Sequence, residues 1–121
     1  MDERIEKWCY DIKMAISEID SFLAELKSNS FEEYQSNLLL KRAIEREFEI
    51  IGEAIHRIIK QDPSFSTTIP EAKSIIGLRN QIIHAYDNIS DENIWSILVN
   101  HLPILKQQID DIIGSSSPPL R

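Results

Sequence analysis

Hydrophobic residues recur at helical spacing along most of the chain, in four segments separated by short polar breaks. In the first segment, residues 2–26, steps of three and four alternate without interruption, through Ile5, Cys9, Ile12, Ile16, Ile19, Leu23 and Leu26. This spacing places all of these side chains on one face of an α-helix. The segment therefore predicts an amphipathic helix that buries this face in a bundle.

The second segment, residues 31–61, repeats the pattern over a greater length. Its apolar positions are Tyr34, Leu38, Ile44, Phe48, Ile51, Ile55, Ile58 and Ile59. The serines and the asparagine of residues 28–30 can cap its start, and Pro63 ends it because a proline ring cannot continue a helix. Gly52 lies inside the pattern at a cost of about 1 kcal/mol relative to Ala, which indicates that another helix approaches closely there.

A Ser/Thr-rich loop at residues 64–70 leads into the third segment. Pro70 suits the first turn of a helix, where a missing N–H costs no hydrogen bond. We expect this helix to be short and to fray near residues 86–88.

The fourth segment begins at Ser90 or Asp91, either of which can serve as its N-cap. Pro103 lies inside the apolar stripe, so we expect a kink or a short break near residues 99–102. Gly114 is expected to end the helix.

Together the segments predict an all-α fold, a four-helix up-and-down bundle with a short third helix and a proline-kinked fourth helix. The length of 121 residues fits one domain, which we place at residues 1–114, followed by a flexible tail at 115–121. Cys9 is the single cysteine, so no disulfide framework is expected.

The chain is acidic, with a formal net charge of −7, which argues against a general nucleic-acid coat. The N-terminus begins directly with charged residues, and no apolar run approaches the roughly 20 residues that span a bilayer. We therefore expect a cytoplasmic protein without membrane contacts. Seven of the 13 Lys and Arg residues lie in residues 41–79, and a solvated helix face of mixed charge explains them most simply.

One stretch of the third segment gathers polar side chains among isoleucines: Arg79, Asn80, His84 and Tyr86 lie within eight residues. On a helical wheel with about 100° per residue, Arg79 and Tyr86 fall on the apolar face, and Asn80 and His84 fall on another. A guanidinium on an apolar face must pair with an acid or lie at an interface.

The residues alone leave two interpretations open. In the structural one, Glu49 or Glu53 of the second segment pairs with Arg79, while His84 and Tyr86 only pack or end a helix. In the functional one, an arginine for phosphate charge and a histidine for proton transfer suit phosphodiester cleavage. A metal site is not expected, because His56, His84 and His101 lie on three different segments. We expect no cofactor.

The run Arg79-Asn80-Gln81-Ile82-Ile83-His84-Ala85-Tyr86 resembles the Arg-x4-His-x-Tyr signature of HepT-like proteins, a branch of the HEPN superfamily of helical ribonucleases. The likeness extends over residues 50–105. It includes Ile50-Ile51-Gly52-Glu53-Ala54, Pro70 followed by Ile75-Ile76-Gly77-Leu78, and Ile94-Trp95 with Leu102-Pro103-Ile104-Leu105.

This resemblance implies a homodimer in which two motifs meet in one cleft and cleave RNA without a metal. His84 would be the acid/base acting on the ribose 2′-hydroxyl, and Arg79 would orient the scissile phosphate and stabilise its charge. Asn80 and Glu53 would support that geometry.

The resemblance further implies a toxin–antitoxin pair. The partner would be an MntA-like minimal nucleotidyltransferase that silences the toxin by adding AMP to Tyr86. Bulky anionic groups there would occupy the phosphate site beside Arg79. The alternative is a non-catalytic helical dimer that serves mainly as a binding partner of the nucleotidyltransferase, and the acidic charge favours it.

Overall fold

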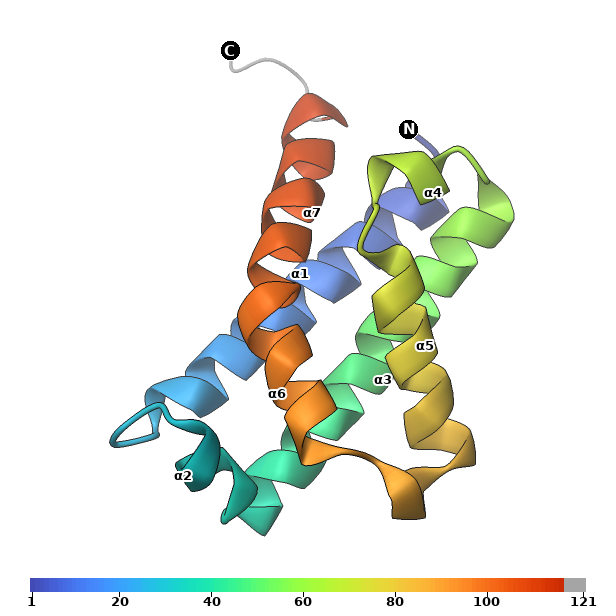
Figure 1. Ribbon diagram of the computed structural model, residues 1–121. Helices are drawn as coiled ribbons and strands as arrows, with labels where there is room; N and C mark the ends of the chain where they lie inside the picture. The colour runs from blue at the N-terminus through green and yellow to red at the C-terminus, as the bar shows by residue number, and fades with distance from the viewer. Residues whose placement is uncertain (117–121) are drawn as a thin grey trace.

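Four helical rods that alternate in direction form the bundle (Figure 1). The rods are α1 (Glu3–Ala24), α3 (Leu38–Gln61), α5 (Ala72–His84), and α6 (Asp91–Asn100) continued by α7 (Leu102–Ser116). This computed structural model describes residues 1–116, except for the side chains of Tyr86 and Ser116. Within this range there is no strand, so the predicted all-α bundle is confirmed. No helix in the same range has the length and apolar character needed to cross a membrane.

The predicted stripe of the first segment is the buried face of α1, which packs against α3 and α7. Ile5, Cys9, Ile12, Ile16 and Ile19 are each at most 2% exposed, whereas Leu23 and Leu26 are only partly buried. The Asp2 carboxylate accepts hydrogen bonds from the backbone N–H groups of the first turn and caps the helix. Burial of this face against two neighbouring helices holds the bundle together.

The predicted continuous helix over residues 31–61 is wrong, because the chain forms two helices, α2 (Phe31–Gln35) and α3. Asn37 has an extended backbone, and its side chain accepts a hydrogen bond from the Leu40 N–H at 3.0 Å. It therefore acts as a new N-cap and resets the helical phase. Leu38, which the pattern assigned to the buried stripe, is consequently 60% exposed. Ser30 caps α2, in agreement with the capping role predicted for residues 28–30.

The segment between α3 and α5 contains a short helix, α4 (Phe65–Thr68), where only a loop was predicted. Ile69 follows it and is fully buried, so the connection is anchored in the core. Pro70 lies in the turn before α5, which begins two residues later than the pattern suggested.

The predicted break in the fourth segment is confirmed at His101, between α6 and α7. It places Pro103 in the first turn of α7, where no backbone donor is lost. Ser90 is the N-cap of α6, as predicted. Gly114, however, does not end α7, which continues to Ser116. No glycine in the described residues has the positive φ of a helix-ending glycine. Residues 117–121 of the predicted tail lie outside the described residues.

The carboxyl of Glu47 is buried between α1 and α3, where only the weaker influence of the Arg46 charge lowers its pKa. Glu47 is 6% exposed; its burial, then a hydrogen bond and charge repulsion from Glu18, raise the pKa of Glu47 to about 7. A carboxyl whose pKa is higher in the folded than in the unfolded chain destabilises the fold where it ionises. Stability should therefore fall as the pH rises from about 4.5 to above 7.

We expect Glu47→Gln to raise the free energy of unfolding by about 1–3 kcal/mol at pH 8 and to leave it nearly unchanged at pH 4.5. Urea unfolding at both pH values measures the difference. An equal effect of the substitution at the two pH values would contradict the assignment.

Candidate active site

Helix α5 lies unusually close to α3 at Gly52. A Cβ atom built on this glycine would be 2.4 Å from Cβ and 2.8 Å from Cγ of Arg79. The close helix approach predicted from Gly52 is therefore confirmed, and the group that crosses the glycine is the aliphatic stem of Arg79. Gly52 thus provides the space through which Arg79 passes.

The guanidinium of Arg79 is held by two acceptors. Its Nη2 lies 2.6 Å from Oε2 of Glu53, and its Nη1 donates to Oδ1 of Asn80 at 2.9 Å. The side chain is 23% exposed, and its buried Nε has no hydrogen-bond partner among the described residues. The predicted pairing with Glu53 is confirmed, whereas Glu49 pairs with Arg46 at 3.2 Å.

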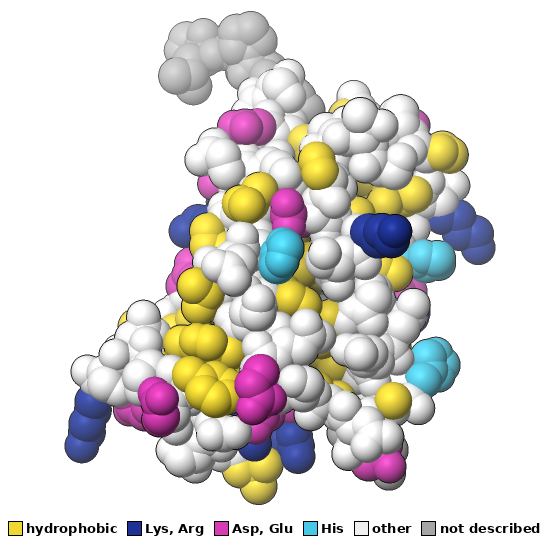
Figure 2. All heavy atoms as spheres, in the orientation of Figure 1, with side chains coloured by type: hydrophobic (Ala, Val, Ile, Leu, Met, Phe, Trp, Pro, Cys, Tyr) yellow, Lys and Arg dark blue, Asp and Glu magenta, His cyan; other side chains and the backbone are white. Residues whose placement is uncertain are grey.

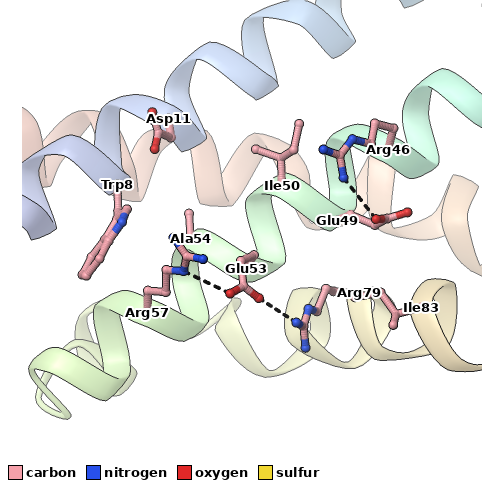
Figure 3. A pocket seen from close by; sticks show the side chains of 10 residues that line it. All are labelled: Trp8, Asp11, Arg46, Glu49, Ile50, Glu53, Ala54, Arg57, Arg79 and Ile83. Atoms are coloured by element: carbon pink, nitrogen blue, oxygen red, sulfur yellow. Dashed lines mark hydrogen bonds and ion pairs between the residues drawn. The ribbon is translucent and has the colours of Figure 1, made fainter.

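The Glu53 carboxylate joins two arginines from different helices (Figure 3). Its second oxygen accepts a hydrogen bond from Nε of Arg57 at 3.0 Å. Sequence analysis did not assign Arg57 to the site, although its i,i+4 spacing from Glu53 on α3 was a usable signal. The result is a chain of charges, Arg57–Glu53–Arg79, across the contact between α3 and α5.

This chain of charges lines a surface hollow of about 300 Å³ between α1, α3 and α5 (Figure 3). Its charged lining consists of Arg46, Arg57, Arg79, Asp11, Glu49 and Glu53. Because the arginines are balanced by acids, an incoming phosphate must compete with carboxylates for them. The hollow also has apolar walls, which include Trp8, Ile50 and the 42% exposed Ile83.

His84 is the last residue of α5, and its side chain is exposed. It makes no side-chain hydrogen bond or ion pair within the described part of the chain, so its ring is available to a substrate. It lies five positions after Arg79, which corresponds to about 7.5 Å along the helix and roughly 140° around it. The two side chains therefore leave α5 on different sides.

Tyr86 follows in the 3-10 helix η1 (Tyr86–Asn88), at the point where fraying was predicted. Its side chain lies outside the described residues. Its expected place on the same side of α5 as Arg79 stays a prediction.

The remaining histidines lie elsewhere. His56 is exposed on α3, and Nδ1 of His101 contacts Oε2 of Glu71, an ion pair that sequence analysis missed because 30 residues separate the partners. No group of three potential metal ligands occurs in the described residues.

The bundle thus carries an arginine and an exposed histidine on one short helix, α5. The family model described as "Ribonuclease HepT-like" matches residues 12–112. The chain belongs to this HepT-like ribonuclease family.

Relatives carry corresponding names. The chain is 31% identical over 98 residues to "Putative RNase TTE0752" of Caldanaerobacter subterraneus subsp. tengcongensis, covering 81% of this chain and 87% of the relative. It is 30% identical to "Putative RNase MJ0125" of Methanocaldococcus jannaschii, covering 90% of each. It is 28% identical to "Probable ribonuclease HepT" of Thermococcus cleftensis, covering 84% of this chain and 89% of the relative. No solved structure matched the chain.

The contact between Gly52 and Arg79 makes a prediction about stability. Gly52→Ala should lower the free energy of unfolding by about 1–3 kcal/mol, because the new methyl group overlaps the Arg79 stem. Gly77→Ala is the matched control on α5, since a Cβ there meets nothing within 4 Å. That substitution should instead raise stability by about 1 kcal/mol through helix propensity. Urea denaturation of both variants tests the contact, and changes of the same sign would refute it.

Proposed function

We propose that this chain is a metal-independent endoribonuclease that works as a homodimer in the cytoplasm and acts as the toxin of a toxin–antitoxin pair. The observation that carries the activity is the disposition of α5. This helix presents a guanidinium held at the α3 contact and, at its C-terminal end, an exposed histidine that has no side-chain partner within the described residues. Membership of the HepT-like ribonuclease family supports RNA as the substrate.

The proposed chemistry is transfer of the phosphodiester to the neighbouring ribose hydroxyl. His84 accepts the proton of the 2′-hydroxyl while that oxygen attacks phosphorus. The bond between phosphorus and the 5′-oxygen breaks, and this oxygen takes up a proton from water. Before RNA binds, Asn80 and Glu53 fix the position of the guanidinium. Arg79 then exchanges Glu53 for the phosphate and balances the charge that develops on the phosphate oxygens. The products are a 2′,3′-cyclic phosphate and a 5′-hydroxyl.

The geometry of α5 supports a second copy of the chain in the site. Arg79 and His84 point roughly 140° apart around one helix, so one phosphate is poorly placed to meet both within a single chain. In a homodimer, Arg79 of one chain can lie opposite His84 of the other. The exposed Ile83 beside Arg79, with half-buried Trp8 and Ile50, supplies apolar surface for such a contact.

The activity is tested with purified protein, a single-stranded RNA and the DNA strand of the same sequence, with EDTA present throughout. We expect cleavage of the RNA alone, with 2′,3′-cyclic phosphate ends. Cleavage of RNA only after a divalent metal is restored, or equal cleavage of DNA, would rule out the proposed chemistry.

Regulation by an MntA-like nucleotidyltransferase is a separate part of the proposal. Co-expression with such an enzyme should relieve growth arrest and add multiples of AMP to the intact mass of the protein. Tyr86→Phe should abolish these additions, and Tyr10→Phe, which alters a 48% exposed tyrosine of α1, should retain them. An unchanged series of masses in Tyr86→Phe would exclude Tyr86 as the acceptor.

The second candidate function is a non-catalytic dimer that binds the nucleotidyltransferase. Two observations favour it: the net charge of −7, and the fact that Glu53 already occupies the guanidinium of Arg79. Stable complex formation by a protein that leaves every tested RNA intact would select this candidate.

A further inference from the structure

A second surface feature lies on the other flank of α5, between this helix and α6. It is a groove of about 320 Å³, within the range of about 300–1,000 Å³ that is usual for ligand sites. Its upper lining consists of Lys73, Gly77, Gln81, Asn93, Ser96 and His101. In Figure 2 the surface between α5 and the α6–α7 rod is mostly white, which means that few charged side chains cover it.

The floor of the groove is closed and its middle is open. Leu78 and Ile97 belong to its lining but are only 2% and 5% exposed, so they close the floor and leave contacts with a ligand to the polar side chains. A Cβ added to Gly77 would meet nothing within 4 Å, which leaves the middle of the groove open. At one end Nδ1 of His101 contacts Oε2 of Glu71, so this carboxylate already has a partner.

Two amide side chains face each other across the groove. Nδ2 of Asn93 donates to Oε1 of Gln81 at 3.3 Å. This bond leaves the amide nitrogen of Gln81 and the amide oxygen of Asn93 without a hydrogen-bond partner in the described residues. A free donor beside a free acceptor matches the edge of a nucleobase, and unstacked bases of single-stranded RNA are recognised through such edges.

The groove and His84 lie along the same side of α5. Lys73, Gly77, Gln81 and His84 follow one another on the same stripe of α5, within about 80° around the helix. Gly77 lies about 10 Å from His84 along the axis, a length of two or three nucleotides at roughly 3.4 Å each. A strand that leaves His84 along α5 therefore enters the groove.

We propose that the α5–α6 groove binds one nucleotide of single-stranded RNA, roughly two or three nucleotides away from the cleaved bond. The edge of the base bonds to Gln81 and Asn93, while Lys73 at the rim faces the backbone phosphate. This inference rests on the proposed ribonuclease function, because it takes RNA as the strand at His84.

Filling the groove tests the proposal. The probe is a fluorescein-labelled, fully 2′-O-methylated single strand of mixed sequence, which cannot be cleaved through its 2′-oxygen. Gly77→Gln should raise its Kd about tenfold in fluorescence anisotropy, the loss expected when a polar contact is blocked. Gly114→Gln is the matched control, since this glycine is also helical with open space around it, and its Kd should stay within about twofold of the wild type.

The proposed RNA binding in the groove would be overturned if the two glutamine variants bound the probe with equal affinity, or if the wild-type protein did not bind it. Circular dichroism of both variants shows that the bundle is intact, and Gln81→Ala, which removes the amide without filling space, should weaken binding in the same direction.

Cleavage of unmodified RNA separates this proposal from the activity itself. If the wild-type protein cleaves no RNA but Gly77→Gln still weakens probe binding, the result supports RNA binding in the groove and refutes the ribonuclease activity. Cleavage by the wild type with an unchanged KM in Gly77→Gln supports the ribonuclease and refutes the groove.

Discussion

His84→Ala is expected to lower the rate of RNA cleavage by about 10²–10⁴-fold, the contribution of a general acid–base group. Its side chain is exposed at the end of α5 and makes no hydrogen bond or ion pair within residues 1–116, so its loss should leave the fold and the dimer unchanged. Single-turnover cleavage of a labelled RNA in EDTA measures the effect.

His56→Ala is the matched control for this substitution. His56 is also exposed, and it lies on α3 one turn from Glu53, but no proton transfer is assigned to it. We expect its cleavage rate to stay within about twofold of the wild type, as for most surface substitutions. If the two histidine variants lose activity to the same extent, His84 is not the acid/base.

Arg79→Ala is expected to lower cleavage by about 10²–10³-fold, because the substitution removes the charge that faces the developing phosphate anion. Arg79→Lys keeps a positive charge but lacks the planar pair of donors, so it should restore only part of the rate. The same single-turnover assay compares the variants.

Glu53→Gln distinguishes this role from a merely structural ion pair. Nη2 of Arg79 lies 2.6 Å from Oε2 of Glu53. Either substitution, Arg79→Ala or Glu53→Gln, therefore removes this ion pair. If Arg79 acts only through this pair, Glu53→Gln should reduce cleavage as strongly as Arg79→Ala. If Arg79 contacts phosphate, Glu53→Gln leaves the guanidinium free and should retain at least about a tenth of the rate.

The bundle could be predicted because its information is local. The buried stripe of α1 follows from the spacing of its apolar residues, and the break before Pro103 follows because a proline ring cannot sit inside a helix without disturbing it. Both features are present in the structure. The division between α2 and α3 was missed because Asn37 stops one helix and starts the next inside a pattern that continues to look periodic. Leu38 shows the consequence, since its side chain points to solvent.

The contacts of Arg79 could be predicted only in part. A guanidinium on an apolar face requires an acid, so Glu49 and Glu53 could be named in advance as the candidate partners, and the structure selects Glu53. The sharing of that carboxylate with Arg57 and the pairing of His101 with Glu71 depend on how the rods are juxtaposed. Periodicity along one helix carries no information on such juxtapositions.

The catalytic roles come from the family signature and not from geometry alone. The structure places Arg79 against α3 and His84 in solvent, on different sides of α5. The central claim is that a second chain brings the two groups together at one phosphate.

Complementation between two inactive variants tests this claim most directly. Arg79→Ala and His84→Ala chains with different affinity tags are co-expressed, and the mixed dimer is isolated through both tags. If each site pairs Arg79 of one chain with His84 of the other, the mixed dimer keeps one intact site and should recover about half of the wild-type cleavage rate. A mixed dimer as inactive as its parents would contradict a site shared between two chains.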